Sequence, residues 1–125
     1  MYLSKVYHWS PTKNRISICK EGLTVFNSSI EYENPLTGKQ EVWRCPYICT
    51  SLEPLTAYNY VIPMFNGGAE LDAELPSLDL YEIDLLETDR VMIRNDSTIR
   101  IIEVRVLNSI PADRVHYIAT RDKEY

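Results

Sequence analysis

The sequence predicts an α+β domain in which a split antiparallel or mixed β-sheet is accompanied by two helices in the N-terminal half. Two helix-start signals lie in the first half, whereas β-branched, aromatic or alternating runs separated by turn residues fill the second half. With 125 residues, of which 45% are hydrophobic and 25% charged, the chain has the size and composition of one folded unit. We therefore expect residues 1–125 to form a single domain with one core.

The chain opens with a strand over Leu3 to Trp9, followed by a first helix over about Pro11 to Glu21. Ser10 is suited to cap the free backbone N–H groups, and proline fits the first helical position. Ile16, Cys19 and Leu23 follow at helical spacing. Gly22 is placed to end this helix in a left-handed conformation.

Residues 27–40 are predicted to form an irregular loop, because Asn34-Pro35 and Thr37-Gly38 are turn signals. A strand over Trp43 to Thr50 follows. Ser51 is then expected to cap a second helix that ends before Pro63. Its inward residues would be Leu55, Tyr58, Val61 and Ile62.

The second half predicts four strands, over Leu78 to Leu86, Arg90 to Arg94, Ile99 to Leu107 and Val115 to Thr120. Alternation along the third of these places Glu103 and Arg105 on one face, about 7 Å apart, and Ile102 and Val104 on the other. A carboxylate among apolar neighbours loses hydration, which requires a partner or a function. One interpretation of Glu103 is therefore an ion pair with arginine on an exposed sheet face.

The chain is acidic, with a formal net charge of -5 and a pI near 5.0. Non-specific nucleic-acid binding is therefore disfavoured, because it relies on neutralising phosphates. Acidic residues concentrate between Glu70 and Glu87, without the spacing of a calcium loop, so we expect a solvated face. Its members are Asp72, Glu74, Asp79, Glu82 and Asp84.

The sequence predicts a cytoplasmic protein. No apolar run approaches the roughly 20 residues that span a bilayer, so we expect no membrane segment, and the N-terminus lacks the pattern of a secretory signal. Cys19, Cys45 and Cys49 do not have the spacing of a zinc site, and we expect reduced cysteines in or near the core. No metal site is expected.

Three segments carry candidate site residues: Tyr7-His8-Trp9-Ser10 near the start, Pro46 to Ser51 in the middle and Ile101 to Val106 near the end. Histidine, tyrosine and glutamate can together hold a ribose and stabilise positive charge at a sugar carbon. Taken singly, His8 also fits a surface or capping histidine, and Tyr47 a core aromatic. Phosphate-binding, nucleophile-elbow and zinc-protease motifs are absent from the sequence.

In this order the segments resemble the motifs of the ADP-ribosyltransferase superfamily, of the type with a His-Tyr-Glu set found in poly(ADP-ribose) polymerases and DNA-modifying toxins. Val-Tyr-His-Trp-Ser leads to a helix ending Glu21-Gly22-Leu23. Tyr47-Ile-Cys-Thr-Ser resembles the second motif. Ile102-Glu-Val-Arg-Val, followed by Ile110-Pro-Ala-Asp-Arg-Val, is similar to the third. The chain also resembles small bacterial and phage proteins that open with Tyr-His-Trp-Ser-Pro.

The resemblance implies a cleft that takes NAD as substrate. His8 would contact the adenosine-side ribose, the Trp9 backbone would hold the nicotinamide amide, and Tyr47 would stack on the nicotinamide ring. Glu103 would be the catalytic residue, stabilising an oxocarbenium-like transition state more than the ground state. The cofactor-binding set would be completed by Ser10 and Ser51.

Three functions remain open from the sequence. The first is transfer of ADP-ribose from NAD to a protein or nucleotide acceptor. The second is a non-catalytic binder that sequesters an NAD-derived or cyclic nucleotide signal, such as a phage counter-defence protein. This alternative arises from three departures from the family: Trp9 stands where the family has a small glycine, the chain is short for a substrate-recognition loop, and its surface is acidic. The third is a structural or interaction protein in which Glu103 pairs with arginine.

Overall fold

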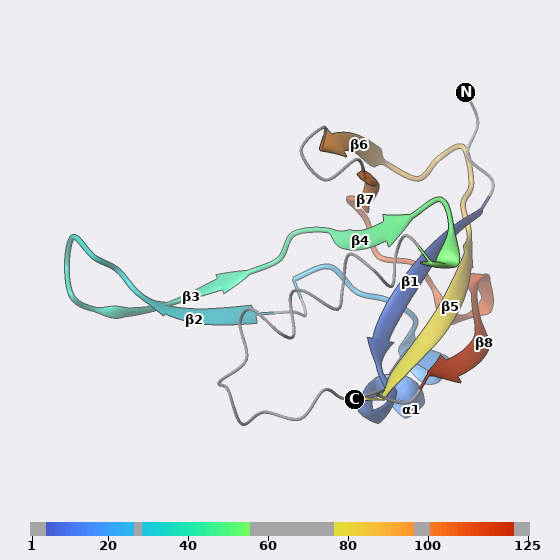
Figure 1. Cartoon of the computed structure of the whole chain (residues 1–125), viewed down its shortest axis with the longest axis horizontal. Coiled ribbons are helices and arrows are strands. Elements are labelled where there is room, and N and C mark those ends of the chain that lie inside the picture. Colours follow the sequence, from blue (N-terminus) through green and yellow to red (C-terminus); the bar gives the residue numbers. More distant parts are fainter. Residues whose placement is uncertain (1–4, 27–28, 56–76, 97–100, 122–125) are drawn as a thin grey trace.

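The computed structural model describes residues 5–26, 29–55, 77–96 and 101–121, and its larger part is a six-stranded sheet (Figure 1). The strand order is β6-β7-β4-β1-β5-β8, and every strand pair is antiparallel. The strands are β1 (Lys5–Pro11), β4 (Ile48–Ser51), β5 (Leu78–Asp84), β6 (Val91–Asp96), β7 (Ile101–Val106) and β8 (Val115–Arg121). The α+β class is confirmed, and the sheet is antiparallel in the described residues.

The predicted first helix is shorter than expected and is divided in two. A 3-10 turn, η1 (Thr12–Asn14), precedes α1 (Arg15–Glu21). Ser10 does not cap it, because β1 continues to Pro11 by pairing with β5. The Ser10 hydroxyl instead accepts a hydrogen bond from the Asn14 amide at 3.2 Å.

The helix buries Ile18, whereas Ile16 is 84% exposed, so the inward face differs from the predicted one. Cys19 is also exposed, which contradicts its predicted place in or near the core. The three cysteines are free thiols, as predicted.

Gly22 ends α1 with a φ of 80°, in the positive range that was predicted. A Cβ at this position would lie 2.0 Å from the Ile110 carbonyl oxygen. The close approach allows Leu23 and Ile110 to exchange two backbone hydrogen bonds, at 2.9 and 2.8 Å. Glycine is therefore required both by the backbone conformation and by the available space.

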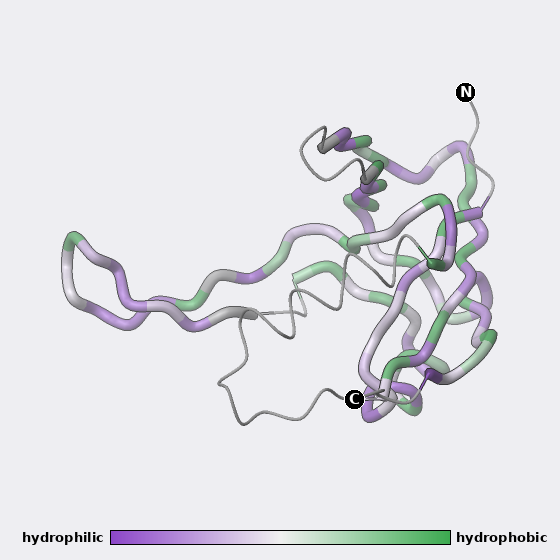
Figure 2. The backbone as a smooth tube through the Cα atoms, in the orientation of Figure 1, coloured by the Kyte–Doolittle hydropathy of each residue, from purple (hydrophilic) through white to green (hydrophobic). Residues whose placement is uncertain are grey.

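The predicted loop at residues 27–40 is wrong: a two-stranded hairpin, β2 (Ser29–Glu33) and β3 (Gln40–Arg44), extends away from the main sheet (Figure 1). The turn signals were read correctly, because residues 35–37 form the turn of this hairpin. Hydrophilic and hydrophobic residues are interspersed along it (Figure 2). Leu36, in the turn, is 93% exposed. Most described side chains of the hairpin are exposed, so it stands apart from the core.

The predicted strand over 43–50 is divided between the end of β3 and β4, with residues 45–47 between them. Ser51 is the last residue of β4 rather than a helix cap. Pro54 and Leu55 are helical. The remainder of the predicted second helix, including Tyr58, Val61, Ile62 and its end before Pro63, lies outside the described residues, as do Leu3, Asp72 and Glu74.

The four strands predicted in the second half are confirmed as β5 to β8, with ends shifted by a few residues. A second 3-10 turn, η2 (Ala112–Arg114), precedes β8. Predicted alternation in β7 is also confirmed, since Val104 and Val106 are fully buried in the core.

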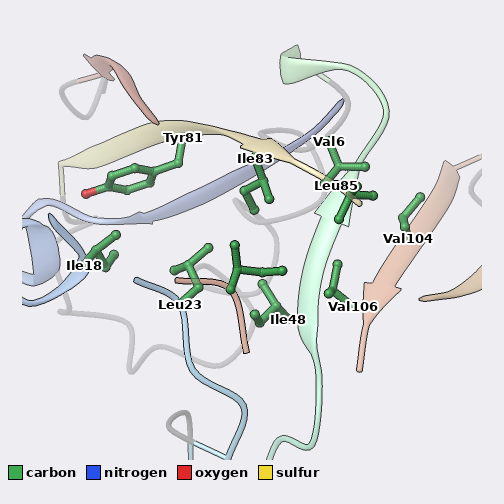
Figure 3. Packing of buried hydrophobic residues seen from close by; sticks show 10 residues of the cluster. Val6, Ile18, Leu23, Ile48, Tyr81, Ile83, Leu85, Val104 and Val106 are labelled. Carbon is green, nitrogen blue, oxygen red and sulfur yellow. The ribbon is translucent and has the colours of Figure 1, made fainter. Parts of the chain in front are cut away.

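One core cluster lies against one face of the sheet, called here the core face (Figure 3). Val6 of β1, Ile83 of β5 and Val104 of β7 are all fully buried in it. Ile18 of α1 also belongs to the cluster, so the helix covers this face. The other members are Leu23, Ile48, Tyr81, Leu85, Val106 and Ile110.

Candidate functional site

Strand β4 lies between β1 and β7, and its register determines which candidate residues share a face. Ser51 pairs with Tyr7 on one side and with Glu103 on the other, and Cys49 pairs with Arg105. Directly opposite residues in antiparallel strands project to the same face. These five residues therefore lie on the face opposite the core cluster, called here the second face.

Glu103 is a buried carboxylate, with only 3% of the residue exposed. The Arg105 Nε donates to Glu103 Oε1 at 2.8 Å. The ion pair with arginine that the sequence allowed is thus present, although on a buried rather than an exposed part of the sheet. The Cys49 thiol also faces this carboxylate. Burial first, and then the charge of Glu103, raises the pKa of Cys49 to about 12, so the thiol stays protonated at neutral pH.

Tyr47 lies beneath the guanidinium of Arg105, whose Cζ is 4.2 Å from the centre of the tyrosine ring. Stacking of this kind is favourable because the ring face is electron-rich. Burial raises the pKa of Tyr47, which keeps its hydroxyl neutral. Tyr47 is therefore neither a core aromatic nor a free stacking surface, because one of its faces holds Arg105.

Ser51 has a buried hydroxyl oxygen that makes no hydrogen bond within the part of the chain that the structure describes. The residue is 3% exposed and lies directly opposite Glu103. Its neighbour Thr50, on the core face, donates to the Val104 carbonyl oxygen at 2.7 Å. An unpaired buried hydroxyl costs about 1–3 kcal/mol. Ser51 is thus an unusual polar group beside the buried carboxylate.

His8 projects by alternation to the core face, where it pairs with Tyr81 of β5. Its Nδ1 lies 2.7 Å from the Cys49 carbonyl oxygen, so the ring bridges β1 and β4. Burial lowers the pKa of His8, and the imidazole is neutral at pH 7. Since a carbonyl only accepts, Nδ1 carries the proton and Nε2 is left as an acceptor.

Trp9 projects to the second face and is 7% exposed. Its indole Nε1 donates to the Pro54 carbonyl oxygen at 2.8 Å, which joins β1 to the segment that follows β4. The side chain therefore has a positioning role that the sequence did not indicate.

Five of the six predicted site residues thus adjoin β4, although they come from three distant segments: His8, Trp9, Tyr47, Ser51 and Glu103. Ser10 does not belong to the group, because it lies on the core face beside Asn14. His8 and Glu103 approach Cys49 from opposite faces, the first through the carbonyl and the second through the thiol. The structure therefore brings the predicted set to one strand but not to one face.

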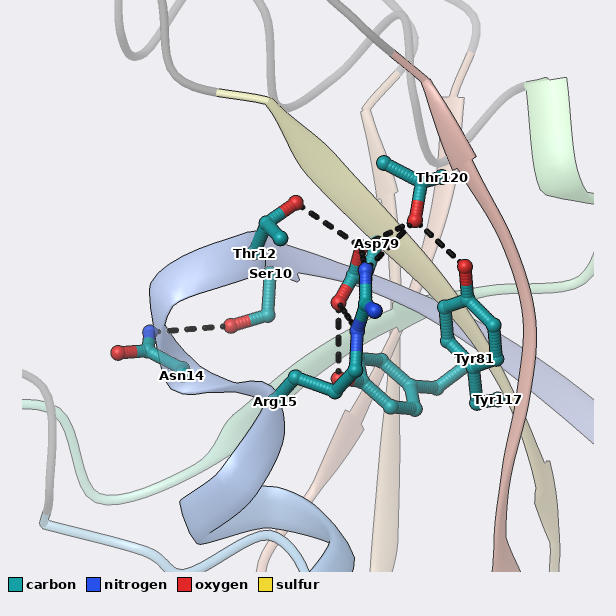
Figure 4. Close-up of polar contacts among 8 residues, drawn as sticks. All are labelled: Ser10, Thr12, Asn14, Arg15, Asp79, Tyr81, Tyr117 and Thr120. Carbon is teal, nitrogen blue, oxygen red and sulfur yellow. Dashed lines mark hydrogen bonds and ion pairs between the residues drawn. The ribbon is translucent and has the colours of Figure 1, made fainter.

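A second buried carboxylate is Asp79, whose polar contacts are drawn in Figure 4. The sequence had assigned it to a solvated acidic face, and that prediction is wrong for this residue. Asp79 is fully buried, and both of its oxygens accept hydrogen bonds from Arg15, at 2.7 and 2.9 Å. Further donors are Thr12 at 2.9 Å, Thr120 at 2.7 Å and Tyr81 at 3.4 Å. The Arg15 hydrogen bonds, followed by those of Thr120 and Thr12, overcome burial and lower the pKa of Asp79 to about 2.

One sequence signal could have singled out Asp79. It is the acidic residue between Leu78 and Leu80, and alternation places it on the same face as Tyr81 and Ile83. Glu82 and Asp84 do fit the predicted solvated face, because they are partly exposed and pair with Lys5 at 2.8 and 3.0 Å.

No protein-family model, curated protein or solved structure matches this chain. Among the described residues, no helix has the length and apolar character needed to cross a bilayer. The same residues contain no group of three or more His, Cys, Asp or Glu side chains arranged to hold a metal ion.

Proposed function

We propose that this protein is a cytoplasmic, non-catalytic binder of an NAD-derived or cyclic nucleotide, built on an ADP-ribosyltransferase-like fold. The observation that carries the proposal is the convergence on β4 of Trp9, Tyr47, Ser51 and Glu103. An unpaired Ser51 hydroxyl beside a buried carboxylate is costly for folding alone, which favours a ligand that uses these groups.

Binding is favoured over turnover by the surroundings of Glu103. A carboxylate that stabilises an oxocarbenium-like sugar must face that sugar without a competing cation. Here Arg105 already donates to Glu103 at 2.8 Å. His8 projects to the other face of the sheet, away from the side on which Glu103 and Trp9 lie.

Transfer of ADP-ribose to a protein or nucleotide acceptor is the second candidate. It is favoured by the burial of Glu103, since a desolvated and firmly held carboxylate acts more strongly on developing positive charge. The transferase would require Arg105 to leave Glu103 when NAD binds.

The test is to titrate ADP-ribose, NAD and a cyclic dinucleotide into the protein by calorimetry, and to measure nicotinamide release from NAD by chromatography. We expect heat of binding for at least one of these nucleotides and no nicotinamide release. Glu103→Gln should weaken that binding by about tenfold, because the substitution removes the charge that orients Arg105. Glu82→Gln is the matched control, since Glu82 is a partly exposed glutamate on the same face and pairs with Lys5.

Three outcomes separate the candidates. Nicotinamide release that disappears in the Glu103→Gln protein would replace the binder with the transferase. Binding that Glu82→Gln weakens as much as Glu103→Gln would move the site away from β4. Absence of heat with every nucleotide would leave the Glu103–Arg105 pair as a structural feature and overturn the proposal.

A further inference from the structure

Arg105 has hydrogen-bonding capacity that the protein does not use. Its side chain is 17% exposed, and its Nε donates to Glu103. Within residues 5–26, 29–55, 77–96 and 101–121, neither terminal nitrogen of Arg105 donates a hydrogen bond. A guanidinium carries five N–H groups in a planar fork, so the edge formed by Nη1 and Nη2 keeps donors that a ligand could use.

The orientation of that edge is set by two contacts. The Cζ of Arg105 lies over the Tyr47 ring, 4.2 Å from its centre, and Glu103 accepts from Nε at 2.8 Å. A fork fixed in this way loses little side-chain freedom when it binds a tetrahedral anion. The geometry therefore preorganises Arg105 for bidentate recognition of phosphate.

The charge around Arg105 also suits an anion, although the whole chain has a net charge of -5. Arg94 of β6 pairs in register with Glu103 and is exposed, so its position lies on the same face. Two arginines therefore accompany one carboxylate, which is itself neutralised by Arg105. Across the strand pair, the Ser51 hydroxyl is more than nine-tenths buried and without a partner in the described part of the chain.

We propose that Arg105 binds a phosphate group of the ligand through its two terminal nitrogens, with Arg94 and Ser51 at the margin of this phosphate subsite. The proposal deepens the proposed function and rests on it, because it specifies that phosphate, rather than the base or ribose alone, determines which ligands bind. The site therefore binds nucleotides, which carry phosphate, and does not bind nucleosides, which lack it.

The first experiment uses the unaltered protein, so it does not depend on the folding of any variant. Calorimetric titrations compare ADP-ribose, ADP, adenosine and inorganic pyrophosphate at low ionic strength. ADP and ADP-ribose should bind with similar affinity, pyrophosphate should bind measurably, and adenosine should bind at least about tenfold more weakly than ADP. Binding of ADP should weaken as salt is raised, because the interaction is ionic.

The second experiment replaces Arg105 by lysine. Arg105→Lys keeps a cation for Glu103 but removes the planar fork, so ADP should bind about tenfold more weakly while the melting temperature changes little. Arg90→Lys is the matched control, since Arg90 is an exposed arginine immediately before β6, and its replacement should leave the affinity unchanged.

The outcomes separate this inference from the proposed function. If ADP-ribose binds and adenosine binds equally well, or if Arg105→Lys leaves the affinity for ADP unchanged, the phosphate subsite is wrong and the nucleotide binder stands. If no nucleotide, nucleoside or pyrophosphate produces heat, both are overturned.

Discussion

Asp79 and Glu103 are buried residues on opposite faces of the same sheet, and their neighbours differ. Asp79, on the core face, is surrounded by donors that are all engaged with it. Glu103, on the second face, is flanked by a serine hydroxyl and an arginine edge with unused hydrogen-bonding capacity. A complete network serves the fold, whereas neighbours with unused capacity are typical of a site that binds something else.

The largest effect should follow the removal of the charge of Asp79. Asp79→Asn leaves Arg15 without its carboxylate and replaces one acceptor oxygen by an NH2 group, which cannot accept the hydrogen bonds that Asp79 Oδ2 receives from Arg15 and Tyr81. Asp79 is fully buried and accepts several hydrogen bonds, so leaving its donors unsatisfied is destabilising, and we expect a loss of about 3 kcal/mol in the free energy of unfolding, measured in urea. A loss below about 1 kcal/mol would mean that the hydrogen-bond network of Asp79 contributes little to the stability of the fold. Nucleotide affinity should not change.

The next effect is a dependence of stability on pH. Hydrogen bonds from Arg15 lower the pKa of Asp79 from 3.8 to about 2, so the folded state holds this proton less tightly than the unfolded state. The resulting stabilisation is present above about pH 4 and is lost as the pH falls toward 2. Because Arg15 is partly exposed, we expect only about 1–2 kcal/mol.

Urea unfolding of the wild type and of Asp79→Asn at pH 6 and pH 3 measures this contribution. The wild type should lose more stability than the variant over this range, since other acidic groups titrate equally in both. Equal losses would contradict the lowered pKa.

The smallest effect distinguishes two adjacent hydroxyls of β4. Thr50→Val removes a hydrogen bond to the Val104 carbonyl and should cost about 1 kcal/mol of stability. Ser51→Ala removes a hydroxyl that has no partner in the described residues, and should leave stability unchanged or raise it by about 0.5 kcal/mol. Thermal unfolding of the two variants makes the comparison. A Ser51→Ala protein less stable than Thr50→Val would show that the serine is structural.

Much of the fold could be predicted because the relevant signals are local. Alternation identified β5 to β8, and Gly22 was correctly placed at the end of the first helix. The hairpin was missed because the turn signals at residues 34–38 were given more weight than the alternating residues on either side of them. Tyr32 and Val42 lie in those flanking strands.

The candidate residues could be named from the sequence, but their arrangement on the sheet could not. Three motif segments do meet at β4, and the alternation that separates Glu103 from Val104 also separates His8 from Trp9, so the set is divided between two faces. The ion pair of Asp79 was beyond sequence reasoning for a different reason, although its burial had a local signal. Its partner Arg15 is 64 positions away in the chain, and no local pattern reveals which cation a buried carboxylate will meet.

The attachment of the hairpin has a consequence for how such proteins diversify. The backbone N–H of Phe26 donates to the carbonyl oxygen of Cys45 at 2.7 Å, so the polypeptide departs and returns at one place. An excursion whose ends already touch can be lengthened, trimmed or exchanged at small entropic cost, leaving the six-stranded body as it is. The β2–β3 hairpin can therefore change in sequence and length independently of the main sheet, which would allow one fold to acquire different binding partners.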